Sequence, residues 1–165
     1  MKATVQSAET KAEDTFSREV VSLLYRLKED FEACDEACQA HCGVTASQGY
    51  TLLALPGDGS LSMNELSESM NLASSTMTRM LDNLVKKGLA FREHDEADRR
   101  IVRVGLTAKG QNLQKAFSGD KLAIGKAVLS NIQRNDQQTV LSAMKKLSEA
   151  VRAVVAQCKT SCFDK

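Results

Sequence analysis

Residues 65–110 read ELSESMNLASSTMTRMLDNLVKKGLAFREHDEADRRIVRVGLTAKG, and the pattern within them decides the fold. Two segments with a helical spacing of apolar residues come first, and Asn71 is the break between them. Two short strands follow, at about residues 89–92 and 101–106, and the residues between the strands are mostly charged. The order of helix, turn, helix, strand, charged tip and strand predicts a mainly helical fold: a winged helix-turn-helix with a small β-hairpin wing.

Capping signals mark the starts of two short helices around this stretch. Thr45 is followed three residues later by Gln48, and Ser62 by Glu65, which is the spacing of a capping box. Between them, the sequence PGDG at residues 56–59 is expected to stop the first of the two helices.

A long helix is predicted before the module. Apolar residues recur at spacings of three and four from Thr15 or Phe16 onward, and Gly43 is placed to end the helix. Residues 1–13 are polar, and we expect them to form a frayed end outside the helix. The apolar stripe exceeds what a small core requires, so this helix is expected to pack against a partner.

Two more long helices are predicted after the module. Thr107 is placed to cap the first of them, and a turn at residues 134–136 is expected to separate the two. Asn135 or Asp136 would then cap the last helix. We find no internal repeat and no low-complexity linker, so no domain boundary is visible in the sequence.

The net charge of +1 conceals an uneven distribution. Residues 1–72 carry 5 basic and 12 acidic side chains, a net charge of −7, whereas residues 73–110 carry 8 and 5, a net charge of +3, and residues 111–165 carry 9 and 4, a net charge of +5. The predicted module and the segment after it are therefore basic, which suits contact with nucleic acid. Solvated faces of unrelated helices would give the same distribution.

Composition also bears on the class of protein. No apolar run approaches the roughly 20 residues of a membrane span, and residues 1–6 lack the apolar core of a secretory signal. We therefore expect a cytoplasmic protein with no membrane partner. The sequence shows only two histidines and no Ser-His-Asp set, carboxylate pair or phosphate loop. We expect a protein that is not an enzyme, with an enzyme or a thiol-based metal carrier as the alternative from another class.

The start of the second helix of the pair predicts a contact with DNA. In a helix-turn-helix, this end of the second helix faces the major groove. Small hydroxyl side chains there can bind phosphates or bases, and an arginine can bind guanine through two hydrogen bonds. The candidate residues are Ser74, Ser75, Thr76, Thr78 and Arg79. The simpler alternative is that the residues from 74 to 76 only cap the helix.

The charged tip carries the second candidate contact. Arg99 and Arg100 on a wing can reach a neighbouring minor groove, where narrow A·T tracts attract arginine. Asp95 and Asp98 have the wrong charge for DNA. We interpret both as supports, Asp98 in particular, because a carboxylate can hold a guanidinium such as that of Arg92 or Arg100 in the position needed to contact DNA. A solvated hairpin without this role is the alternative.

These residues resemble the MarR family of bacterial transcriptional regulators. The resemblance runs from Leu66 to Gly110, and its most specific parts are the wing sequence Asp98-Arg99-Arg100 and the sequence Leu106-Thr107-Ala108-Lys109-Gly110. It implies that the segment from Ser74 to Arg79 aligns with the recognition helix. It also implies that Arg100 aligns with the wing arginine that enters the minor groove.

The resemblance further implies a two-fold homodimer. Residues 1–44 and 111–165 would supply interleaved dimerisation helices, and residues 45–110 would form the DNA-binding module. Two such modules would bind a palindromic operator in double-stranded DNA, and we expect the protein to act as a repressor.

Five cysteines stand in two groups that share a helical spacing. They are Cys34, Cys38 and Cys42 in the first predicted helix, and Cys158 and Cys162 in the last. Residues four apart lie on one face, about 6 Å apart along the axis, which suits chelation of one soft ion better than a disulfide. Binding by all three thiols of the first group requires the helix to break near Gly43. If the two groups converge, they would suit zinc, another thiophilic metal or metalloid, or an iron–sulfur cluster.

Three interpretations of the cysteines stay open. They sense a metal or metalloid, they form a redox switch, or they are inert core residues, since Cys34, Cys38 and Cys158 continue apolar stripes. His41 is either a further ligand or a lone exposed histidine. The alternative to thiol-based sensing is a small apolar or phenolic effector that binds between the dimer body and the module, as the resemblance implies.

Overall fold

The computed structural model describes the backbone of residues 2–162 and the side chains of residues 13–157. The elements in chain order are α1 (Lys2–Cys42), α2 (Ala46–Ala54), β1 (Ser60–Ser62), α3 (Met63–Ser69), α4 (Ser74–Lys86), β2 (Ala90–His94), β3 (Val102–Leu106), α5 (Ala108–Ser130) and α6 (Arg134–Cys162). The chain divides into two compact units, residues 1–120 and 121–165. None of the helices in the described part of the chain combines the length and the apolar character that a membrane span needs. The prediction of a mainly helical chain with a winged helix-turn-helix is confirmed.

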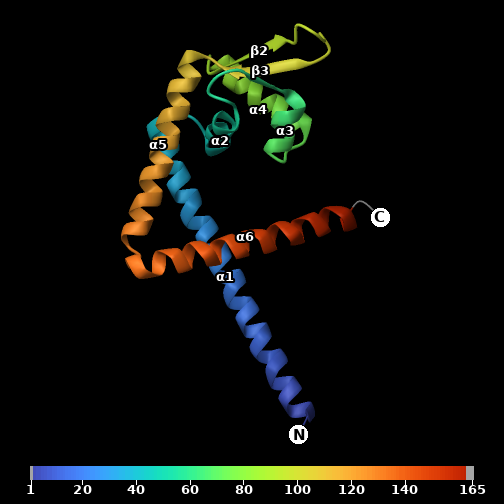
Figure 1. Ribbon diagram of the computed structural model, residues 1–165, viewed down its shortest axis with the longest axis vertical. Helices are drawn as coiled ribbons and strands as arrows, with labels where there is room; N and C mark the ends of the chain where they lie inside the picture. The colour runs from blue at the N-terminus through green and yellow to red at the C-terminus, as the bar shows by residue number, and fades with distance from the viewer. Residues whose placement is uncertain (1, 163–165) are drawn as a thin grey trace. The chain divides into compact units, whose positions relative to one another are not determined.

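The winged module contains a three-stranded antiparallel sheet in the order β1-β3-β2. Figure 1 shows β2 and β3 as a hairpin next to α3 and α4, with the loop between the strands at the edge of the module. In the register, Ala90 pairs with Leu106 and Ser60 with Gly105. The sequence predicted the hairpin but missed β1, because a three-residue strand leaves no periodicity and Ser62 also serves as the cap of α3.

Both predicted capping boxes are present. The Thr45 hydroxyl accepts a hydrogen bond from the backbone N–H of Gln48, and the Gln48 side chain accepts one from the backbone N–H of Thr45. Ser62 and Glu65 form the same reciprocal pair, and the hydrogen bond from the Ser62 backbone holds the pKa of Glu65 below its ordinary value. These caps satisfy backbone donors that a helix start leaves unpaired.

Two predicted helix boundaries were wrong. Helix α1 begins at Lys2 and not near Thr15, since residues 2–14 contain no Pro or Gly and many good helix formers, and polarity alone does not prevent a helix. Helix α6 begins at Arg134, so Asn135 and Asp136 lie in its first turn instead of capping it.

In the turn before α6, backbone carbonyl groups accept hydrogen bonds from the side chain of Gln137, which the sequence did not point to. The amide nitrogen of Gln137 donates to the carbonyl oxygens of Leu129 and Ile132, which lie at and after the end of α5. The turn therefore falls at residues 131–133, and the carboxylate of Asp136 lies in the first turn of α6, where the helix dipole favours it.

The core of the module determines which face of α4 points outward. The fully buried side chains include Leu52, Leu66, Met77, Leu81, Leu84 and Val104. Three of them lie on α4 at spacings of four and three, which places them on one face of the helix. Each fully buried leucine contributes about 1.5–3 kcal/mol of transfer free energy, so rotation of α4 about its axis is strongly disfavoured. Its opposite face is therefore held outward.

The junction between the sheet and α5 explains the sequence from Leu106 to Gly110. The backbone N–H of Thr107 donates to the carbonyl oxygen of Leu89 at 3.1 Å. The Thr107 hydroxyl donates to the carbonyl oxygen of Gly88 at 2.7 Å and accepts from the N–H of Gly110 at 3.1 Å. A Cβ atom on Gly110 would lie 1.8 Å from the carbonyl oxygen of Leu89, so only glycine fits there.

We expect Gly110→Ala to lower the free energy of unfolding by about 2–3 kcal/mol, because the added methyl group meets backbone that no rotamer change can move. Gly119→Ala on the same helix is the matched control, since nothing lies within 4 Å of its added Cβ. The free energy of unfolding of that control should rise by up to about 1 kcal/mol, because Ala has a higher helix propensity than Gly. Urea denaturation followed by circular dichroism measures both, and equal effects of the two substitutions would contradict the proposed close contact.

Candidate nucleic-acid interface

The first turns of α4 present their polar side chains to solvent. Ser74, Ser75, Thr78 and Arg79 are exposed and Thr76 is half-buried. The N-cap of α4 is Ala73, which has no side-chain capping bond, so the neighbouring hydroxyls are not used as the cap. The Thr78 hydroxyl donates to the carbonyl oxygen of Ser74, which leaves its oxygen able to accept. This helix start is an exposed set of donors and acceptors at the positive end of a helix dipole.

The wing is a loop that Asp95 organises. One carboxylate oxygen of Asp95 accepts from the backbone N–H groups of Ala97 and Asp98, and the other accepts from Arg103 Nε at 2.7 Å. The Arg103 guanidinium, with those two N–H groups, holds the pKa of Asp95 below its ordinary value. The backbone N–H of Asp95 also donates to the carbonyl oxygen of Ile101, which closes the loop.

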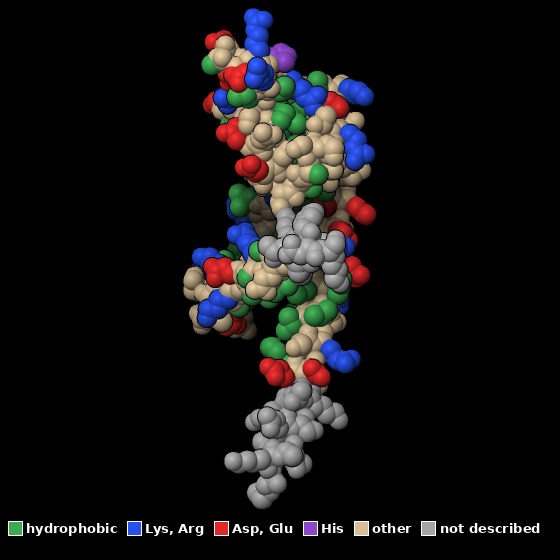
Figure 2. All heavy atoms as spheres, turned by 90° about the vertical axis from the view of Figure 1, so that its right-hand side faces the viewer, with side chains coloured by type: hydrophobic (Ala, Val, Ile, Leu, Met, Phe, Trp, Pro, Cys, Tyr) green, Lys and Arg blue, Asp and Glu red, His purple; other side chains and the backbone are tan. Residues whose placement is uncertain are grey.

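The tip of this loop presents two arginines. Arg99 and Arg100 are exposed, and the carbonyl oxygen of Arg99 lies 2.8 Å from Nδ1 of His94. Figure 2 shows Lys and Arg side chains, a His and several Asp or Glu side chains together at the top of the view, where Figure 1 places the loop between β2 and β3. The wing therefore presents guanidinium groups on a loop whose backbone is held by hydrogen bonds to the Asp95 carboxylate.

The role predicted for Asp98 needs correction. Its carboxylate accepts a hydrogen bond from the backbone N–H of Arg100 at 2.9 Å, so it supports the loop backbone and not a guanidinium. The guanidinium of Arg92 is held instead by Asp82, at 2.5 Å, and by the carbonyl oxygen of Thr78, at 3.1 Å. Because Asp82 and Thr78 belong to α4, Arg92 joins the wing strand β2 to the helix that carries the candidate base contacts.

The cysteines of α1 do not converge on one point. Cys38 is buried and Cys34 and Cys42 are half-buried, and all three are free thiols. The helix runs unbroken from Cys34 to Cys42, which separates these two by about 12 Å. The break that three-thiol binding requires is therefore not present between them. The side chains of Cys158 and Cys162 lie outside the described residues.

The sequence left open whether His41 is a lone exposed histidine, and the structure shows that it has a partner. Its Nδ1 lies 2.8 Å from Oδ2 of Asp120, and the thiol of Cys42 donates to the same oxygen at 3.3 Å. The hydrogen bond to Asp120 raises the pKa of His41, and burial followed by the hydrogen bond to Asp120 raises the pKa of Cys42. A raised pKa keeps the Cys42 thiol protonated, which lowers its reactivity toward oxidants. Sequence analysis missed Asp120 because it lies 78 residues from Cys42 along the chain.

Comparison of the sequence with known proteins identifies the family of this chain. The model of the MarR family matches residues 44–102. The repressor MdtR of Bacillus subtilis is 33% identical over 109 residues, which cover 66% of this chain and 70% of MdtR. The chain belongs to the MarR family. Another relative, the repressor YetL of Bacillus subtilis, is 26% identical over 147 residues, which cover 87% of this chain and 88% of YetL.

Solved structures of MarR-type proteins share the fold. YusO of Bacillus subtilis has a TM-score of 0.66 and 27% identity, and the match covers 83% of this chain and 97% of YusO. FabT of Streptococcus pneumoniae in complex with DNA has a TM-score of 0.71 and 17% identity, with 80% of this chain and 96% of FabT covered. As a MarR-family member, the chain is a DNA-binding transcriptional regulator and not an enzyme.

The ion pair between Arg92 and Asp82 is testable by a double-mutant cycle. We expect Arg92→Gln and Asp82→Asn to show a coupling of about 0.5–1 kcal/mol in unfolding free energy, because the two side chains are 30% and 44% exposed and water screens the pair. Chemical denaturation of the two single variants and the double variant measures it. Strictly additive effects would show that Arg92 does not hold β2 to α4 through Asp82.

Proposed function

We propose that the chain binds a palindromic operator as a homodimer and represses transcription. The observation that carries this proposal is the link through Arg92, which connects the exposed start of α4 to the wing strand. Two DNA-reading elements can bind adjacent grooves only if their separation is fixed. A contact at 2.5 Å between the guanidinium and Asp82, with the α4 core packing beneath, supports such a fixed separation.

The proposed contacts divide between the two grooves. The exposed residues from Ser74 to Arg79 would enter the major groove, with Arg79 able to bind guanine and the hydroxyls able to bind phosphates or bases. Arg99 and Arg100 would enter the neighbouring minor groove. Asp95 lies on the same loop but is engaged by Arg103 and the loop backbone, which reduces its repulsion of phosphate.

Exposed apolar side chains outside the module support a homodimer. The described part of α1 leaves Phe16 (68%), Tyr25 (65%) and Phe31 (53%) exposed. The second unit, described separately, leaves Leu122 (60%) and Val154 (58%) exposed. Figure 2 shows hydrophobic side chains on the surface of the lower part of α1. Surfaces of this kind on two units indicate a protein interface, and the opposite net charges of residues 1–72 and 111–165 favour pairing of these helices.

The relatives support the repressor role. MdtR and YetL are both named as repressors. A protein of the same fold, FabT, has been solved with DNA bound. These similarities concern those proteins, and we extend them here to this chain because the start of α4 and the wing are both exposed and structurally ordered by the contacts described above.

Two arginine substitutions test the proposed DNA contacts. We expect Arg79→Ala to lower duplex affinity by roughly 5- to 150-fold, since a two-bond base contact contributes about 1–3 kcal/mol. Arg100→Ala should weaken binding and reduce the slope of log affinity against log salt by about one. The probe is a duplex selected from a random library by the wild-type protein, and fluorescence anisotropy at several salt concentrations gives the affinities.

Arg134→Ala is the control, because Arg134 is an exposed arginine outside the module. It should bind like the wild-type protein. The proposal fails if Arg79→Ala and Arg100→Ala also bind like the wild type at moderate ionic strength, or if the purified protein is monomeric.

We propose that thiol chemistry supplies the signal, either by oxidation or by a thiophilic metal or metalloid. Cys34 is partly accessible from solvent, which this role requires. The competing candidate is a small apolar or phenolic effector. A cleft of about 470 Å³ where α1 meets α2, with a mixed polar and apolar lining that includes Val44 and Lys87, is the place where we would expect it to bind.

A quadruple variant separates these two signals. Soft metals or thiol-selective oxidants should weaken duplex binding by the wild-type protein. A variant with Ser at Cys34, Cys38, Cys158 and Cys162 should lose most of that response, because only Cys42, a thiol of raised pKa, remains. Anisotropy before and after treatment measures the response. A full response in that variant would refute thiol sensing by these four residues, and release of DNA from it by a phenolic compound would support the effector instead.

A further inference from the structure

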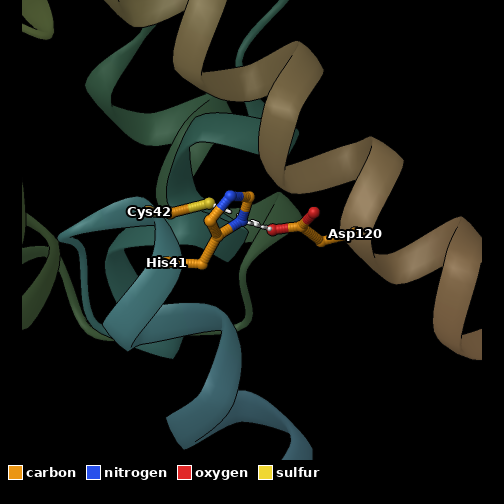
Figure 3. A group of neighbouring side chains, drawn as sticks. All are labelled: His41, Cys42 and Asp120. Carbon is orange, nitrogen blue, oxygen red and sulfur yellow. Dashed lines mark hydrogen bonds and ion pairs between the residues drawn. The ribbon is translucent and has the colours of Figure 1, made fainter.

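Three donor atoms of different chemistry meet where the end of α1 lies against α5. They are Nδ1 of His41, Sγ of Cys42 and Oδ2 of Asp120, and suitable ligand atoms of the three residues all lie within 4.8 Å of one another. Figure 3 shows the imidazole ring and the sulfur, from neighbouring positions on α1, both directed at the Asp120 carboxylate on α5. All three residues belong to the first compact unit.

We propose that His41, Cys42 and Asp120 bind one divalent cation of the zinc class, with a further coordination position open. Zinc binds nitrogen, sulfur and oxygen ligands at about 2.0–2.3 Å, which places two ligands of one tetrahedral ion roughly 3.3–3.7 Å apart. The nitrogen and oxygen now lie 2.8 Å apart, and the sulfur and oxygen 3.3 Å apart. The nitrogen and the sulfur would each need to move away from the oxygen by less than about 1 Å. The nitrogen and the sulfur lie within 4.8 Å of each other, so this pair would need to stay close or approach. Mg²⁺ and Ca²⁺ are disfavoured because they require mostly oxygen ligands.

The donors lie on segments that are held in place on both sides. On the α1 side, Gly43 has a left-handed backbone (φ +68°), its N–H donates to the carbonyl oxygen of Gln39, and its own carbonyl oxygen accepts from Lys87 Nζ at 3.1 Å. The connection after Cys42 is therefore fixed to the end of α4. A preorganised donor set binds a cation without the cost of ordering its ligands.

The α5 side is fixed to the winged module. The amide nitrogen of Gln114 donates to the carbonyl oxygens of Leu52 and Leu55 at 2.7 and 2.8 Å. Phe117 is fully buried, and its ring meets Tyr50 edge-on with centroids 5.8 Å apart. Asp120 follows on the same helix within one turn, so its position relative to the end of α1 is determined by these contacts.

Access to the site is open on the histidine side. The His41 side chain is 72% exposed and that of Asp120 is 28% exposed, whereas Cys42 packs partly against the core. An ion can therefore enter from solvent, and water or another donor can fill the open position. This inference goes beyond the proposed function, because the cation would bind whether or not the chain binds DNA.

Cobalt is the probe for this site, since Co²⁺ takes zinc's ligands and absorbs light. We expect the reduced, metal-free, full-length protein to bind one Co²⁺ per chain at His41, Cys42 and Asp120. Binding should produce a thiolate-to-cobalt charge-transfer band and the visible bands of a four- or five-coordinate ion, and one equivalent of Zn²⁺ should remove them. Cys42→Ser should abolish the charge-transfer band. His41→Asn and Asp120→Asn should each weaken Co²⁺ binding by at least about tenfold, as loss of metal-site residues generally does.

Cys34→Ser is the matched control, because Cys34 lies two helical turns earlier on α1 and is a free thiol. It should leave the cobalt spectrum unchanged. The site is refuted if the wild-type protein shows no charge-transfer band, if the band survives Cys42→Ser, or if His41→Asn and Asp120→Asn both leave affinity unchanged. In those cases the three residues form a hydrogen-bonded contact only. Circular dichroism of each variant confirms the fold.

Duplex binding by the same samples separates this inference from the proposed function. DNA binding without cobalt binding counts against the metal site alone. A cobalt spectrum in a protein that binds no duplex counts against the proposed function alone.

Discussion

The carbonyl group of Leu89 is the point on which the arrangement of the winged module depends. It lies between the end of α4 and the start of β2, it accepts the N–H of Thr107, and it leaves no room for a side chain at Gly110. Lys109 adds a bond from its Nζ to the carbonyl oxygen of Lys87 at 3.1 Å. The end of β3 and the first turn of α5 are thus fastened to the end of the candidate recognition helix. The wing strand β2 and the helix α5 therefore both start at this junction.

Such a junction matters if, as proposed, the signal acts on other elements than those that contact DNA. The arginines of the wing and the hydroxyls of α4 can act together only if β2 cannot tilt against α4, and Arg92 opposes that tilt by bonding to Asp82 and to the Thr78 carbonyl. Displacement of α5 would in turn be transmitted through Thr107 to the same strands. These contacts tie β2, α4 and the start of α5 together. We therefore expect a change of affinity for DNA to come from moving whole modules rather than from rearranging one.

Features set by neighbouring residues could be predicted from the sequence, and features set by distant ones could not. Thr45, Ser62 and Thr107 cap helices through partners three residues away, so the spacing alone located them. The pairing of Arg92 with Asp82 depends on how β2 crosses α4, which no local pattern encodes. Strand β1 forms only because β3 offers it a partner. The start of α1 was misplaced for another reason: a polar composition indicates exposure and says little about whether a helix forms.

The cysteines also show that sequence spacing predicts which residues share a helix face but not what surrounds each of them in the fold. Cys34, Cys38 and Cys42 share one helical spacing, and from the sequence they form a single group. In the folded unit they differ, because Cys38 is buried while Cys42 meets a histidine and a carboxylate. A thiol beside a carboxylate is a poor nucleophile, since the negative charge disfavours the thiolate, yet the same carboxylate is a ligand for a cation that displaces the proton. The Asp120 carboxylate therefore makes Cys42 better suited to binding a metal than to reacting with an oxidant.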